Sequence, residues 1–214
     1  MRNENSFKIR KIISLVKNLP YFSFNNLSGI ENDRTYLKIL FSRYKKSGKL
    51  IRLKRGVYVT KDYVDKLEKM NKISIYTEFL SSILYEPSYL SLEYVLYQNN
   101  LITEIPKNFT LITKKKTIIF SNFFGNFIYH KIKNELFCGF EVFKENDFII
   151  YKAKKSKALF DFLYLRKRNI LNKKMFEELR LNLDELTKID KEELLEFINL
   201  EGSKKMKEIL NYIF

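Results

Sequence analysis

Apolar side chains recur at helical spacing in two separate stretches of the first fifty residues. Between residues 7 and 19 they recur every three or four positions, which predicts a helix that ends at Pro20. A short helix is expected around residues 25–28. A longer amphipathic helix is expected from Asp33, whose side chain can cap its first turn, to Ser47, just before a glycine. The sequence therefore predicts a helix, a short helix and a helix in that order.

A basic two-stranded hairpin is predicted directly after the third helix. Residues 50–53 and 57–60 alternate between apolar and polar side chains, as half-buried strands do. Lys54-Arg55-Gly56 joins them, and the glycine can adopt the left-handed conformation of a tight turn. Residues 61–72 are polar and are expected to form a connector, part of which continues as helix. This order of elements is typical of a winged helix-turn-helix, so we predict such a domain over residues 1–72.

Residues 73–214 combine helical segments with a central region of alternating hydrophobicity. Helical spacing is seen near residues 75–84 and 92–96, and again over much of the C-terminal segment. Between residues 109 and 152 the period changes to two, which is typical of strands. The predicted strands are residues 109–113, 117–120, 127–132, 136–142 and 148–152. This pattern predicts a C-terminal α+β domain over residues 73–214, in which helices flank an antiparallel sheet.

The positive charge of the chain lies mostly in its first third. The formal net charge is +15, from 40 Lys and Arg against 25 Asp and Glu. Residues 1–75 hold 18 basic and 6 acidic residues, residues 76–150 hold 7 and 8, and residues 151–214 hold 15 and 11. An AT-rich coding bias would raise lysine everywhere, but it would not deplete acids in one third alone. The asymmetry indicates a polyanionic partner for the N-terminal domain.

One face of the third predicted helix carries the residues expected to contact double-stranded DNA. A rotation of 100° per residue separates the apolar side of this helix from a polar outer face. The predicted contact residues on the helix are Arg34, Thr35, Lys38, Ser42, Lys45 and Lys46. Such a helix fits the major groove, where the first four would reach base edges or nearby phosphates. The hairpin adds Arg52, Lys54 and Arg55, which are expected to contact phosphates. An ordinary solvated helix surface is the competing interpretation.

The sequence offers few residues for catalysis or metal binding. A single cysteine, Cys138, excludes an internal disulfide and a multi-cysteine zinc site, and a single histidine, His130, excludes a histidine-rich one. Glu141 and Lys144 are separated by two residues, whereas nuclease acid–lysine motifs need one. No segment has the apolar length of a signal peptide or a membrane span. We therefore expect a cytoplasmic protein that is not an enzyme and needs no cofactor or metal.

Five segments, in order along the chain, carry motifs that a known protein family also shows. They are GKLIRLKRGVYV at residues 48–59, EPSYLSLEYVLY at 86–97, TKKKT at 113–117, FGNFIY at 124–129 and KALFD at 157–161. Together they resemble the AbiEi-type antitoxins of type IV toxin–antitoxin systems, which are associated with abortive infection of phage-attacked bacteria. The chain departs from the family pattern at Asn100, where a glycine is usual, and at Val95, where a small residue is usual.

The resemblance implies a different role for each domain. The N-terminal winged helix would repress the promoter of its own two-gene operon. The C-terminal domain would counteract a nucleotidyltransferase-like toxin without binding it stably. Two alternatives remain open from the residues alone. One is a winged-helix regulator whose C-terminal domain senses a small effector, and the other is a DNA-modifying enzyme that a winged helix directs to DNA.

Overall fold

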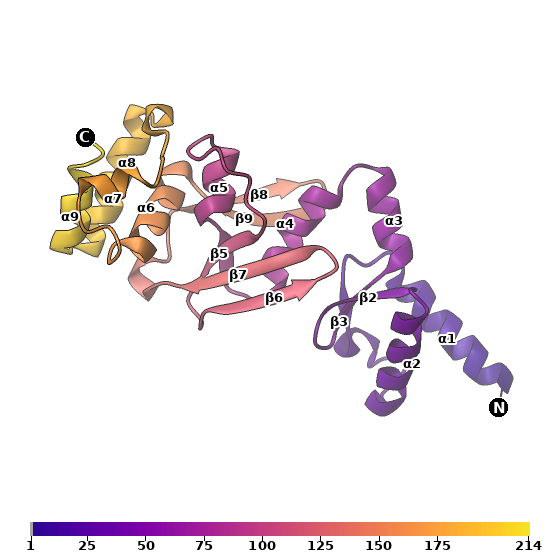
Figure 1. Cartoon of the computed structure of the whole chain (residues 1–214). Coiled ribbons are helices and arrows are strands. Elements are labelled where there is room, and N and C mark those ends of the chain that lie inside the picture. The colour runs from indigo at the N-terminus through magenta and orange to yellow at the C-terminus, as the bar shows by residue number, and fades with distance from the viewer. Residues whose placement is uncertain (1) are drawn as a thin grey trace. The chain divides into compact units, whose positions relative to one another are not determined.

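The chain folds into two compact units (Figure 1). A computed structural model describes the backbone of residues 2–214 and the side chains of residues 9–214. Unit 1 comprises Met1–Thr77 and Ser121–Phe124, and unit 2 comprises Glu78–Phe120 and Gly125–Phe214. Helices and two sheets occur in the described residues, so the chain is α+β, as predicted.

Unit 1 contains helices and a small antiparallel sheet. Its elements are α1 (Arg2–Val16), β1 (Phe22–Ser23), the 3-10 turn η1 (Phe24–Leu27), α2 (Arg34–Lys46), β2 (Leu50–Lys54), β3 (Val57–Thr60), α3 (Lys61–Lys69) and the start of α4 (Ile73–Leu84). The strands lie in the order β1-β3-β2, and both neighbouring pairs are antiparallel. The helix α2 and the β2–β3 hairpin follow the predicted boundaries closely. The connector expected at residues 61–72 is helical over most of its length, as the helix α3, where only part of it was expected to be helix.

Local sequence determines where α2 begins and which side of it is buried. The Asp33 carboxylate caps the helix, because its Oδ1 accepts hydrogen bonds from the backbone N–H groups of Thr35 (2.8 Å) and Tyr36 (3.1 Å). The buried side chains of α2 are Leu37, Leu40 and Phe41. Burying one leucine or phenylalanine side chain stabilises a fold by roughly 1.5–3 kcal/mol, so this stripe fixes the rotation of the helix. The opposite side of α2 is therefore left for solvent or a partner.

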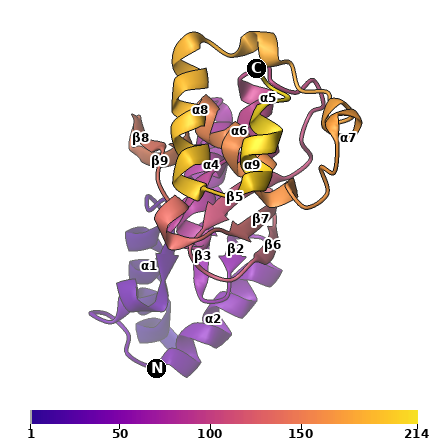
Figure 2. The same cartoon turned by 90° about the vertical axis from the view of Figure 1, so that its left-hand side faces the viewer.

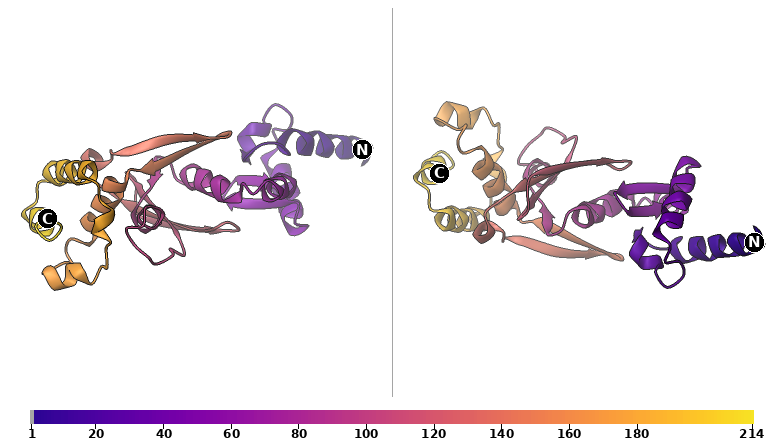
Figure 3. Two further views of the ribbon diagram at one scale, coloured as in Figure 1. Left: turned by 90° about the horizontal axis from the view of Figure 1, so that it is seen from above. Right: turned by 90° about the horizontal axis from the view of Figure 1, so that it is seen from below.

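Unit 2 places most of its helices after the strands. Its elements are the end of α4, β4 (Ser88–Leu90), α5 (Leu92–Gln98), β5 (Phe109–Thr113), β6 (Ile118–Asn122), β7 (Gly125–Lys131), η2 (Asn134–Leu136), β8 (Phe140–Glu145), β9 (Phe148–Ala153), α6 (Lys155–Arg166), α7 (Lys173–Glu177), η3 (Leu183–Glu185), α8 (Lys188–Glu201) and α9 (Lys204–Leu210). Figures 2 and 3 show the orange and yellow helices α6–α9 gathered at one end of this unit, where α6 packs on α8 and α8 on α9.

The sheet of unit 2 is mixed, and the prediction of an antiparallel sheet is wrong. Its strands lie in the order β6-β7-β5-β4-β9-β8. The strand β5 runs parallel to β7, with Phe109 opposite Phe127, and β4 runs parallel to β9 through Leu90 and Lys152. The pairs β4–β5 and β8–β9 are antiparallel. Alternating hydrophobicity predicts that a segment is a strand, but it does not identify the neighbouring strand.

A buried ion pair lies where α6 meets the sheet of unit 2. Lys157 and Asp161 face each other across one turn of α6, with 2.6 Å between Nζ and Oδ1, and both side chains are 0% exposed. The hydroxyls of Tyr89 and Ser91 donate to Asp161 Oδ2 over 3.0 and 2.8 Å. The Lys157 ammonium also lies 4.5 Å from the centre of the Phe160 ring. Because both charges have close partners, the pair satisfies the requirement for burying charged groups.

Candidate nucleic-acid interface

The contact residues predicted for α2 lie on its outer face (Thr35, Lys38, Ser42 and Lys46) or flank that face (Arg34 and Lys45). Arg34, Thr35, Lys38, Ser42, Lys45 and Lys46 are each exposed. Arg34 lies in the first turn and Lys46 in the last, so the set extends over about 18 Å of helix axis at 1.5 Å per residue. The structure thus arranges these residues as a row along one helix and not as a compact cluster. A row of this length suits a polymer better than a small anion.

The β2–β3 hairpin presents the other predicted residues. Arg52 lies opposite Tyr58, the register shifts after it, and Lys54 lies opposite Val57. Gly56 has a φ of +79°, which confirms the left-handed turn expected from the sequence. Arg52 and Arg55 are exposed, whereas Lys54 is half-buried at the end of β2. The Arg52 Nε donates to the Lys54 carbonyl over 3.4 Å, so the two residues are held side by side.

Most cations of α2 and the hairpin form no ion pair with another described residue. Residues 34–60 contain nine Lys and Arg and no Asp or Glu. In the part of the chain that the structure describes, no ion pair involves Lys38, Arg43, Lys45, Lys46, Arg52 or Arg55. Arg34 Nη2 donates to the neutral Asn25 Oδ1 over 3.3 Å. The positive charge of this surface is therefore not neutralised locally.

Several lysines of unit 2, unlike those of α2, form ion pairs with acidic side chains. Lys152 pairs with Glu78 at 2.8 Å, and Lys154 pairs with Glu193 at 2.7 Å. Further pairs at 2.6 to 2.8 Å join Lys155 to Asp190 and Lys157 to Asp161. Other lysines of unit 2, such as Lys204 and Lys207, form no ion pair among the described residues, so unpaired lysines are not confined to unit 1. What distinguishes residues 34–60 is that they include no Asp or Glu.

Two exposed residues of α2 were missed by the sequence interpretation. Arg43 is exposed, and Ile39 is 49% exposed among the polar residues of the outer face. The rotation that selected Lys38 could have identified Arg43, because both lie about 110° from the centre of the buried stripe. Ile39 carried no such signal, since an apolar residue in a helix is normally assigned to the core. Its exposure offers an apolar contact, such as the methyl group of thymine.

The residues considered for chemistry elsewhere are not brought together. His130 is half-buried on β7, and burial, helped by the nearby Arg166 guanidinium, lowers its pKa below the ordinary value although Glu93 acts in the opposite direction. Cys138 is half-buried, and its Sγ lies 4.0 Å from the Glu135 carbonyl oxygen. Among the described residues no three His, Cys, Asp or Glu side chains are placed to hold a metal ion. The described helices are also too short or too polar to cross a membrane.

A scan against protein-family models found none that matches this chain, and a search of curated proteins found no similar sequence. Its function is therefore inferred from its residues and their arrangement.

Proposed function

We propose that unit 1 is a winged helix-turn-helix that binds double-stranded DNA, and that the protein represses transcription of its own operon. The order α1, β1, η1, α2, β2, β3 supports this assignment, with η1 in the place of the short second helix. In this proposal α2 is the recognition helix and the β2–β3 hairpin is the wing. The three-stranded sheet β1-β3-β2 joins the wing to the start of the unit.

The observation that carries the proposal is the exposed row of unpaired cations on α2, interrupted by short polar side chains. Thr35 and Ser42 are small enough to let the helix approach base edges, and both can donate or accept hydrogen bonds. Lys45 and Lys46 at the end of the helix, together with the hairpin residues, are suited to phosphates on either side of the groove. The helix α2 would recognise the base sequence of the DNA, and the hairpin would add affinity for a duplex of any sequence.

A binding assay with two duplexes tests this proposal. The protein should prefer a fragment from upstream of its own gene over a shuffled duplex of the same composition. Replacing Lys38 and Ser42 by alanine should reduce that preference, since each good base contact discriminates by roughly 1–3 kcal/mol. Lys204→Ala with Lys207→Ala on α9 removes exposed lysines from unit 2 and should leave the preference intact. Equal binding of both duplexes by the unmodified chain would contradict the proposed repressor role.

The antitoxin role is a further part of the proposal and is supported by the resemblance to AbiEi-type antitoxins. In this role unit 2 counteracts a nucleotidyltransferase-like toxin from the neighbouring gene, without stable binding. Co-expression tests it: the neighbouring gene alone should arrest growth, and this chain should restore growth even as an Arg52→Ala, Lys54→Ala, Arg55→Ala variant. Growth arrest that this chain does not relieve would contradict the antitoxin role and leave the DNA-binding proposal unaffected.

A further inference from the structure

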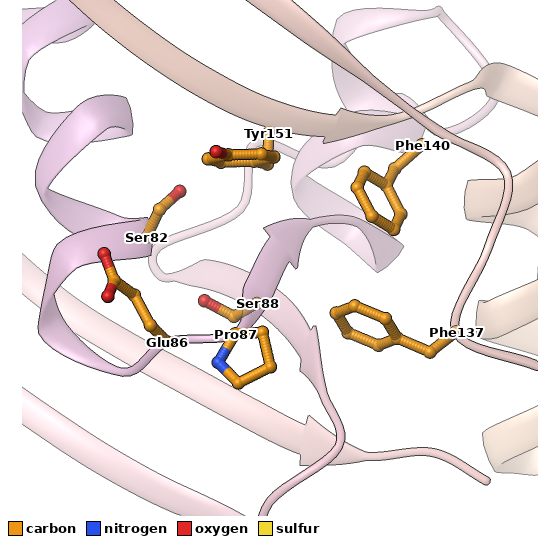
Figure 4. A pocket seen from close by; sticks show the side chains of 7 residues that line it. All are labelled: Ser82, Glu86, Pro87, Ser88, Phe137, Phe140 and Tyr151. Carbon is orange, nitrogen blue, oxygen red and sulfur yellow. The ribbon is translucent and has the colours of Figure 1, made fainter. Parts of the chain in front are cut away.

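Unit 2 contains a pocket of about 320 Å³ between the end of α4 and the strands β4, β8 and β9 (Figure 4). Ser82 comes from α4, Ser88 from β4, Phe140 from β8 and Tyr151 from β9. This volume is at the lower end of the range for small-molecule sites, so it limits an occupant to about the size of one nucleoside.

Two buried hydroxyls of this pocket lack hydrogen-bond partners among the described residues. Ser82 is 2% exposed and Ser88 is 6% exposed, and neither Oγ has a hydrogen-bond partner among the described residues. Burying a hydroxyl without a hydrogen bond destabilises a fold, and most buried polar groups are therefore satisfied. Figure 4 shows both hydroxyls among the residues that surround the pocket, on the same side as the Glu86 carboxylate. Their placement indicates that they serve a ligand.

The opposite side of the pocket is aromatic. The rings of Phe137 and Phe140 lie with centroids 5.3 Å apart, edge to face, and Tyr151 lies 6.2 Å from Phe140 (Figure 4). Tyr89 stacks on Phe140 at 4.6 Å from behind and holds that ring in place. Phe137 and Phe140 are half-buried and Tyr151 is exposed. Aromatic rings that line a pocket favour a flat ring system, which can stack on them or meet their edges.

The Glu86 carboxylate adds a preference for hydrogen-bond donors. Glu86 is exposed beside the pocket, and within the described chain it forms no ion pair. An ionised carboxylate only accepts hydrogen bonds, whereas the hydroxyls of Ser82 and Ser88 can donate or accept. A matching ligand is planar, carries N–H donors on one edge and has an acceptor next to them. A ligand with only carbonyl groups on that edge would be repelled by the carboxylate.

We infer that this pocket binds a nucleoside whose base carries an exocyclic amino group, as adenine and cytosine do. The amino group would donate to Glu86, the adjacent ring nitrogen would accept from a serine hydroxyl, and the base would contact the aromatic side. Uracil is disfavoured, because its single N–H on that edge is flanked by two carbonyl oxygens. This inference does not depend on DNA binding by unit 1, and the two can fail separately.

Calorimetric titration of the full chain with adenosine, cytidine and uridine tests the inference. Adenosine or cytidine should bind, and uridine should bind at least about tenfold more weakly. Ser82→Ala with Ser88→Ala should weaken binding by roughly tenfold or more, since each lost hydrogen bond accounts for a several-fold change. The same variant should keep or raise the melting temperature, because it removes buried hydroxyls that no described residue hydrogen-bonds. A merely structural role for these serines would lower the melting temperature instead.

Ser81→Ala is the matched control, because the Ser81 hydroxyl is equally buried but donates to the Glu78 carbonyl over 2.6 Å. It should leave nucleoside binding unchanged and lower the melting temperature. Glu86→Gln alters an exposed side chain, so it should fold normally and should reduce the preference for adenosine or cytidine over uridine. No binding of adenosine or cytidine, equal binding of uridine, or unchanged binding by the double serine variant would each overturn the inference.

Discussion

Removing the carboxylate of the buried pair on α6 should strongly destabilise unit 2. In an Asp161→Ala variant the Lys157 ammonium, which is 0% exposed, loses its counterion. The hydroxyls of Tyr89 and Ser91 lose the acceptor that they now reach over 3.0 and 2.8 Å. Breaking a buried ion pair by removing one partner costs about 3–5 kcal/mol, and a buried donor left without a partner costs about 1–3 kcal/mol more.

These costs are not additive, so we expect a loss of at least about 3 kcal/mol in the free energy of unfolding. Typical domains are stable by only about 5–15 kcal/mol, so the loss is a large fraction of the total. Urea denaturation followed by circular dichroism measures this loss of stability. The slope of the free energy of unfolding against urea concentration should be the same in each variant, which would confirm that the same surface is exposed on unfolding.

An exposed pair of the same type provides the control. Lys61 and Asp65 on α3 also form a Lys–Asp ion pair across one helical turn, but their side chains are 38% and 42% exposed. Asp65→Ala should have little effect, because water solvates both groups and screens their attraction. Replacing both buried partners, as in Lys157→Met with Asp161→Leu, should recover much of the stability lost in Asp161→Ala. The reasoning is refuted if Asp161→Ala and Asp65→Ala change the free energy of unfolding equally.

Two further changes probe the packing and the titration of unit 2. Gly139→Ala should lower the free energy of unfolding by about 2 kcal/mol or more, because its φ is +72° and a Cβ would lie 2.5 Å from the Phe197 ring. Gly48→Ala, at a φ of +73° with open space around it, should lose only about 1 kcal/mol, and equal losses in a denaturation assay would contradict the packing argument. His130 has a folded pKa below its ordinary value of 6.5, so its contribution to stability is fully present above pH 6.5 and is lost as the pH falls from there through the lower folded pKa. His130→Gln should make the melting temperature depend less on pH between neutral and mildly acidic conditions. If the variant shows the same pH dependence as the unmodified chain, groups other than His130 cause it.

Features determined by nearby residues were predictable from the sequence. The cap at Asp33, the end of α2 before Gly48 and the left-handed turn at Gly56 each depend on one residue and its immediate neighbours. The outer face of α2 was predictable for the same reason, because the rotation of a helix follows from its apolar stripe.

Features determined by distant residues were not predictable. The strand β4 has only three residues, and it lies between two longer strands that come later in the sequence. Lys157 would be expected in solvent on any helix, and its complete burial depends on Asp161 and Phe160 of the same helix and on the Phe197 ring of α8. The pocket that includes Ser82 and Ser88 forms only when α4, β4, β8 and β9 meet, so no local pattern marks its residues.

The salt dependence of DNA binding decides whether the cations of α2 and the hairpin contact phosphates. If about five or six phosphates are neutralised, the logarithm of the binding constant should fall with the logarithm of salt concentration with a slope near −5. Lys54→Ala with Arg55→Ala should make this slope shallower by up to ~2 and should weaken binding to all duplexes alike. Lys204→Ala with Lys207→Ala removes the same charge from unit 2 and should leave the slope unchanged. Binding that does not depend on salt, or equal slopes for the two double variants, would contradict the proposed interface.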